Sequence, residues 1–144
     1  MKKILISCFL FIAFCSSIQA DTLKDKEAAR ELAKKVMEKI ADGDTEGGVS
    51  LVKPYFIIPD HEFAGMLNSI RMQAPAIEQR FGKTIGTEFV ALEEAGDSLM
   101  LIMYMQKFEK HVMRWKFYFY KPNDAWVLNT FNTDDQIQLM FKKY

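Results

Sequence analysis

The fold is decided by a stretch of alternating side chains, LMLIMYMQKFEKHVMRWKFYFY, which spans residues 99–120. On both sides of Glu109-Lys110, large apolar residues recur at every second position, which is the spacing of β-strands that bury one face. The charged pair in the middle suits a tight two-residue turn. The sequence therefore predicts an antiparallel hairpin with strands at residues 99–108 and 112–121.

The turn also predicts the register of the hairpin, because it pairs Phe108 with His111, Tyr104 with Trp115 and Ile102 with Phe117. Paired residues share a face of the sheet. We expect one face, rich in aromatic residues, to form the core. Its members are Met100, Ile102, Tyr104, Gln106, Phe108, Met113, Trp115, Phe117 and Phe119. The opposite face mixes apolar and charged residues, namely Leu99, Leu101, Met103, Met105, Arg114, Lys116, Tyr118 and Tyr120.

Two more strands flank the hairpin in the sequence, at residues 84–93 and 126–133. They are separated from it by Ala95-Gly96-Asp97 and Pro122-Asn123-Asp124, whose residue types favour tight turns. Short turns join antiparallel neighbours. The predicted sheet therefore has four antiparallel strands.

Helical spacing precedes Gly82. Apolar residues between Ala28 and Ile40 repeat on one side of an amphipathic helix of about twenty residues, which we expect to end at Asp42-Gly43-Asp44. A short helix is predicted over residues 45–53. A third begins at Asp60, predicted as its N-cap, and Pro75 is expected to kink or split it. Its apolar stripe comprises Phe63, Met66, Leu67, Ile70, Ala74, Ile77 and Phe81. The fold class is therefore α+β, with N-terminal helices packed on the sheet.

The first twenty residues have the three parts of a cleavable secretory signal peptide. Lys2 and Lys3 supply the positive start, residues 4–14 the apolar run, and residues 16–20 the short polar end. The apolar run is too short to cross a bilayer, which takes roughly twenty residues. We expect cleavage near Ala20, a periplasmic or secreted location and no stable membrane anchor.

Residues 21–144 then form a single α+β domain of 144 − 20 = 124 residues. Both cysteines lie in the leader, so this domain has no thiol. Loss of Lys2 and Lys3 lowers the basic count from 19 to 17 against 19 acidic residues, a net charge of 17 − 19 = −2. A binder of nucleic acid needs a basic stripe, and none is visible, so no nucleic-acid partner is expected.

Three local features carry a resemblance to a known family. They are Ala41-Asp42-Gly43-Asp44 after the first helix, Phe81-Gly82 before the first strand, and the run at residues 117–128 with Trp126 after the turn. Together with the order of helices and strands, they resemble the nuclear-transport-factor-2-like superfamily, also called cystatin-like α+β, in a small exported bacterial member. The resemblance implies a cone-shaped, curved sheet that often encloses an apolar pocket. Its members include ketosteroid isomerases, polyketide cyclases, scytalone dehydratases and non-catalytic binding domains.

Candidate ligand-binding residues lie on the aromatic face and on the first strand. Tyr104, Gln106 and Trp115 are the polar or amphipathic members of an otherwise apolar face, as in a ligand pocket, although they equally suit an ordinary core. Glu88 is the acid in the middle of a strand. A three-residue turn places it opposite Ile102 on the inner face, and a two-residue turn places it opposite Met103 on the outer face. Because buried unpaired acids are rare, the outer position is favoured.

The outer face supplies a candidate interface for a homodimer. Contiguous exposed apolar patches mark interaction surfaces, and this face carries Leu101, Met103, Met105, Tyr118 and Tyr120. The alternative is a monomer in which the stems of Arg114 and Lys116 cover the methionines.

No catalytic, metal-binding or cofactor-binding cluster is predicted. His61 lies beside Asp60 and Glu62 at the expected start of a helix, which favours a surface histidine. Strand alternation separates Met100 from Met103 and Met105, which argues against a copper site. The sequence therefore predicts a non-enzymatic binding domain for a small apolar or lipid-like ligand. The alternatives are an enzyme of the isomerase, dehydratase or cyclase kind, and an inhibitor, immunity factor or envelope-assembly partner that acts through its surface.

Overall fold

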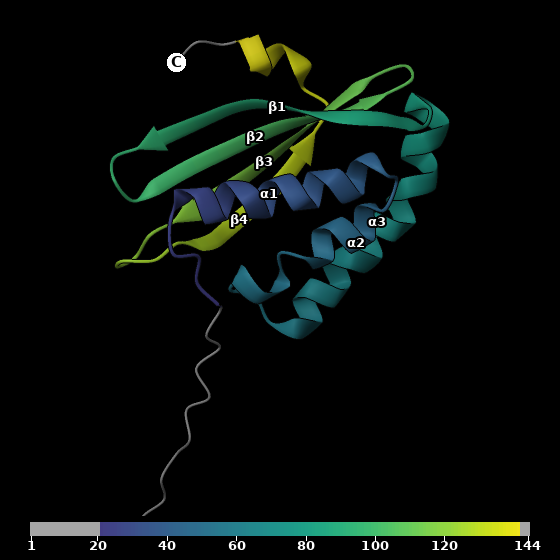
Figure 1. Cartoon of the computed structure of the whole chain (residues 1–144). Helices are drawn as coiled ribbons and strands as arrows, with labels where there is room; N and C mark the ends of the chain where they lie inside the picture. The colour runs from purple at the N-terminus through teal and green to yellow at the C-terminus, as the bar shows by residue number, and fades with distance from the viewer. Residues whose placement is uncertain (1–20, 142–144) are drawn as a thin grey trace, which may run out of the picture.

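The computed structural model describes residues 21–141, so the predicted leader and its cleavage site lie outside the described residues. Figure 1 shows the helices α1, α2 and α3 gathered on one side of the sheet, which has four strands. The helices are α1 (Lys26–Ala41), α2 (Thr45–Ser50) and α3 (Asp60–Phe81), with 3₁₀ helices η1 (Lys53–Tyr55) and η2 (Ile137–Phe141). The strands are β1 (Thr84–Ala95), β2 (Leu99–Phe108), β3 (Val112–Tyr120) and β4 (Val127–Asp134). The predicted α+β class is confirmed.

The sheet is antiparallel in the order β1-β2-β3-β4. In the central hairpin Tyr104 faces Trp115 and Ile102 faces Phe117, which is the register predicted from the two-residue turn. Register shifts interrupt the pairing of β1 with β2 and of β3 with β4. Such irregularities bend a strand and increase its twist, so they favour a curved sheet that stays open.

The core lies between α1 and the inner face of the sheet. Asp25 caps α1 by accepting a hydrogen bond from the backbone N–H of Ala28 at 2.8 Å, and Gly43 follows the helix with a positive φ of 86°. The fully or nearly fully buried core residues of α1 and the sheet are Ala29, Ala33, Val36, Met37, Ile40, Met100, Ile102, Phe117, Phe119 and Leu128. Each large apolar side chain buried in this way contributes roughly 1.5–3 kcal/mol. The predicted core face of the hairpin is therefore confirmed at its centre.

Helix α3 differs from its prediction at its start and along its apolar stripe. Asp60 is the first residue of the helix, and Pro59 occupies the N-cap position predicted for Asp60. The Asp60 carboxylate instead forms an ion pair with Lys53 Nζ at 2.7 Å. Of the two outcomes predicted at Pro75, a kink or a split, the split does not occur, since α3 continues through the proline as one helix. Arg71, whose carbonyl the proline leaves without its helical partner, is an exposed residue. Within its apolar stripe, Phe63 and Phe81 at the two ends are the buried members.

The junction between α3 and β1 is held by the turn between β2 and β3. Gly82 has φ 84° and ψ −171°, a conformation essentially confined to glycine. The backbone N–H of Lys110 donates to the carbonyl of Phe81 at 2.9 Å, and that of Lys83 donates to the Glu109 carboxylate at 3.1 Å. A Cβ at Gly82 would lie 2.8 Å from that of Glu109.

Within residues 21–141, no helix is both long and apolar enough to cross a membrane.

Replacing Gly82 with alanine should therefore lower the free energy of unfolding by about 2–3 kcal/mol, because the backbone strain adds to the crowding of Glu109. Gly65→Ala is the matched control, since Gly65 lies inside α3 with open space around it. That change should raise stability by about 0.5–1 kcal/mol. Urea denaturation measures both, and equal effects of the two changes would contradict the role assigned to the junction.

Candidate functional site

A cavity of about 540 Å³ lies between the second half of α3 and the inner face of the sheet. Sites that hold small molecules span roughly 300–1,000 Å³ and have mostly apolar walls. On the helix side the cavity is lined by Ile70, Ala74 and Ile77, and on the sheet side the apolar lining is Phe108, Met113 and Trp115. The cavity therefore has the size and the lining of a small-molecule site.

The cavity explains why the apolar stripe of α3 is buried at its ends. Phe63 and Phe81 are buried, whereas Ile70 and Ile77 are half-buried and Ala74 is exposed. All three of these middle residues line the cavity. The stripe was predicted as core packing, and Met66, Leu67 and Ile70 do pack against the core, but Ile70, Ala74 and Ile77 also face an open volume.

A chain of hydrogen bonds runs along the sheet wall of the cavity. Trp115 Nε1–H donates to Gln106 Oε1 at 2.9 Å, and Gln106 Nε2 donates to Thr84 Oγ1 at 2.8 Å. Gln106 and Trp115 are 4% and 3% exposed, and all three residues line the cavity. Two of the predicted ligand-binding residues, Gln106 and Trp115, therefore lie together at the site.

Thr84 was not among the predicted site residues. The signal that could have found it is its position at the start of β1, where it pairs with Phe108 of the predicted core face. The charged residues that line the cavity, Asp42, Glu78 and Lys83, were also missed as site residues. They are exposed, so they form a polar rim around an apolar interior.

Tyr104 lies on the inner face but is not among the cavity residues. Its ring packs edge-on against Phe89 with centroids 5.5 Å apart, and burial raises the pKa of its hydroxyl. It is a half-buried member of the predicted core face and lies outside the cavity lining.

Glu88 lies on the outer face, opposite Met105. Neither predicted partner, Ile102 or Met103, is correct, because the turn lies at residues 96–98, where Ala95 pairs with Leu99, and a further register shift between Phe89 and Ala91 changes the pairing again. The carboxylate is exposed and accepts a hydrogen bond from Lys107 Nζ at 3.3 Å. Glu88 therefore has no place in the cavity, which agrees with the outer position that the sequence favoured.

The histidines also lie away from the cavity lining. His61 is exposed at the start of α3, as expected from the sequence. The His111 ring packs against Phe81, with centroids 4.4 Å apart. Across residues 21–141, no cluster of three or more His, Cys, Asp or Glu could hold a metal ion.

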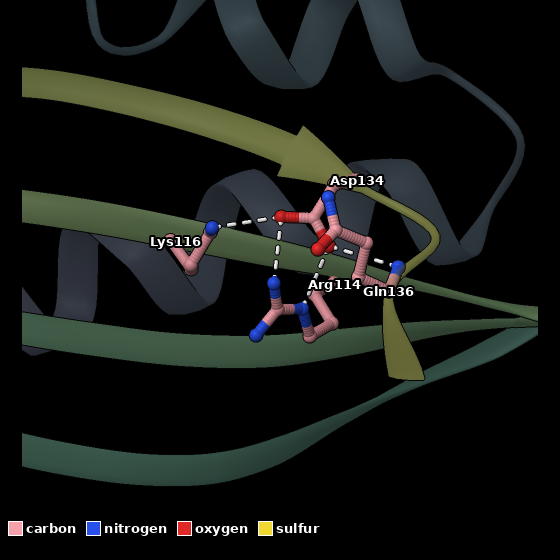
Figure 2. Close-up of polar contacts among 4 residues, drawn as sticks. All are labelled: Arg114, Lys116, Asp134 and Gln136. Carbon is pink, nitrogen blue, oxygen red and sulfur yellow. Dashed lines mark hydrogen bonds and ion pairs between the residues drawn. The ribbon is translucent and has the colours of Figure 1, made fainter. Parts of the chain in front are cut away.

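On the outer face, an aspartate joins β3 to the end of β4 (Figure 2). Asp134 accepts hydrogen bonds from Arg114 at 2.7 and 2.8 Å, from Lys116 at 2.7 Å and from the backbone N–H of Gln136 at 3.0 Å. Partial burial opposes its ionisation, but these donors outweigh that effect and hold the pKa of Asp134 far below its usual range. The arrangement compensates the charge of Arg114, which is 4% exposed.

The same segment changes the predicted interface. Beyond Asp134 the chain continues into η2, which contacts β3 and lies across the sheet from α1 (Figure 1). Met103 is buried, Leu101, Met105 and Tyr118 are half-buried, and Tyr120 is 39% exposed. The outer face is therefore partly covered by the chain itself, which the sequence analysis did not foresee.

Neither family models, nor curated proteins, nor solved structures give a match to this chain.

Asp134→Asn should lower the free energy of unfolding by about 2–3 kcal/mol at neutral pH, because it leaves buried Arg114 without a counter-charge. The ion cluster contributes fully above the ordinary aspartate pKa of 3.8. Because the pKa is lower in the folded state, this contribution is lost as the pH falls further, and wild type and variant should converge.

Asp135→Asn is the matched control for Asp134→Asn. Its carboxylate pairs with Arg80 at 3.5 Å on the surface, so its loss should cost less than about 1 kcal/mol. Denaturation curves between pH 7 and pH 2 measure both variants. A gap between wild type and Asp134→Asn that stays constant with pH would contradict the assignment.

Proposed function

We propose that this chain is an exported binding domain that holds a small apolar or lipid-like molecule in the cavity between α3 and the sheet. The observation that carries the proposal is the apolar stripe of α3, whose middle residues face an open volume. Covering such a surface with an apolar ligand removes it from water, which contributes roughly 25 cal/mol of favourable free energy for each Å² of apolar surface buried. A ligand would thus complete the core on this side of the sheet.

The export part of the proposal rests on the leader at residues 1–20. The layout of helices and sheet, with a cavity between them, supports the proposed relationship to the nuclear-transport-factor-2-like superfamily. Within that superfamily both enzymes and binding domains occur, so the fold does not choose between them. The choice rests on the site.

Binding is favoured over catalysis by the positions of the ionisable candidates. An enzyme of the isomerase, dehydratase or cyclase kind needs an acid or a histidine directed into the apolar interior. Glu88 and His61, the two residues weighed for that role, are exposed and do not line the cavity. The acids that do line it, Asp42 and Glu78, belong to the exposed rim.

Titration with N-phenyl-1-naphthylamine, a neutral apolar fluorophore, tests the binding proposal. The wild-type protein should bind it with enhanced fluorescence, and Ala74→Phe should weaken binding at least about tenfold, because the ring fills the cavity from α3. Ala76→Phe is the control, since Ala76 is exposed on the same helix and does not line the cavity. No binding by the wild type, or equal loss in both variants, would overturn the proposal.

We further propose that two copies of the chain pair through the uncovered end of the outer face. Leu99 is 45% exposed and lies opposite Tyr120, which is also exposed, and Leu101 follows opposite Tyr118. Adjoining apolar residues of this kind form a patch that a second copy can cover.

Sedimentation at micromolar concentration tests the dimer. The wild type should sediment as a dimer and Leu101→Lys as a monomer, because a charge in the interface is costly to desolvate. Gln138→Lys, at an exposed position of η2, is the control and should remain dimeric. A wild type that sediments only as a monomer would end the dimer proposal.

A further inference from the structure

The orientation of the Gln106 side chain follows from its partner. The indole Nε1–H of Trp115 can only donate, so the Gln106 atom 2.9 Å from it must be the oxygen. The amide nitrogen of Gln106 then points at Thr84 and donates to its hydroxyl oxygen at 2.8 Å. Tryptophan thus determines the direction of the whole hydrogen-bond chain.

The Thr84 hydroxyl proton is consequently directed away from Gln106. A hydroxyl that accepts one hydrogen bond still has one proton to donate. Among residues 21–141 no acceptor bonds to this proton, whereas Thr87 of the same strand donates to the carbonyl of Met37 at 3.2 Å. Thr84 lines the cavity, so its proton is available to a molecule held there.

The charge around the cavity limits the kind of molecule that can use this donor. Two carboxylates, Asp42 and Glu78, and one cation, Lys83, lie among its lining residues. The rim is therefore net negative and disfavours an anionic ligand such as a carboxylate. An uncharged oxygen acceptor avoids this repulsion and still satisfies the donor.

We infer that the cavity is selective for an uncharged apolar molecule with one hydrogen-bond-accepting oxygen, which Thr84 binds through its hydroxyl. Gln106 and Trp115 are positioning residues that orient this hydroxyl. The inference rests on the proposed binding function and adds the polar group that the ligand must carry.

Two probes of similar shape test the inference by displacing N-phenyl-1-naphthylamine. 2-Acetylnaphthalene carries a carbonyl oxygen, and 2-isopropylnaphthalene has a methyl group in its place. In Thr84→Val a methyl group replaces the hydroxyl and cannot donate a hydrogen bond, so the ketone should bind roughly three- to tenfold more weakly than it binds the wild type. The hydrocarbon should stay within about twofold of its wild-type affinity.

Two further variants separate the hydroxyl from its surroundings. Thr84→Ser keeps the hydroxyl and should retain the wild-type preference for the ketone. Thr133→Val makes the same exchange at another threonine that lines the cavity but lies outside the hydrogen-bond chain, and should leave the preference unchanged. Circular dichroism verifies that each variant is folded before binding is measured.

The outcomes distinguish this inference from the proposed function. Equal effects of Thr84→Val on ketone and hydrocarbon, or tighter binding of 2-naphthoate than of the ketone, would overturn the inference and leave the cavity a general apolar site. Failure of the fluorophore and of every probe to bind the wild type would overturn both.

Discussion

The register of the β2–β3 hairpin is the constraint on which the rest of the structure depends. Because side chains alternate across a strand, a slip of one residue would exchange the inner and outer faces completely. The observed register places Ile102 opposite Phe117 and Met100 opposite Phe119, all four at 2% exposure or less. The same register brings Gln106 and Trp115 onto the inner face, where their hydrogen bond becomes part of the cavity wall.

The cavity arises because α1 and α3 meet the sheet in different ways. Helix α1 buries a continuous face from Ala29 to Ile40, whereas the fully buried residues of α3 are Phe63 and Phe81, and its stripe between them is only partly buried. Gly82 lies where the chain passes from α3 into β1, and its neighbours Phe81 and Lys83 are hydrogen-bonded to the β2–β3 turn.

The outer face follows a separate electrostatic requirement. Arg114 is buried there, and a buried charge is costly unless it is paired. Asp134 meets this requirement from the end of β4 and, through the backbone of Gln136, orders the start of the C-terminal segment. That segment covers part of the face and leaves its apolar end near Leu99 and Tyr120 exposed. The inner face of the sheet thus carries an apolar cavity, and the outer face carries a charged cluster. On the outer face, apolar residues are exposed where the C-terminal segment does not cover them.

Local patterns in the sequence determined the four strands, the hairpin register and the core residues between Met100 and Phe119, because side-chain period and turn length are properties of neighbouring residues. The same patterns identified Gln106 and Trp115. Only the tertiary structure decided which apolar residues meet side chains and which meet open space, since the stripe of α3 looks the same in either case. It also decided that Glu88 pairs with Met105, through a register shift that no periodicity reveals, and that Thr84 of β1 is hydrogen-bonded to Gln106 of β2. Contacts of this kind depend on where distant segments are placed, and so they lie beyond the reach of local spacing.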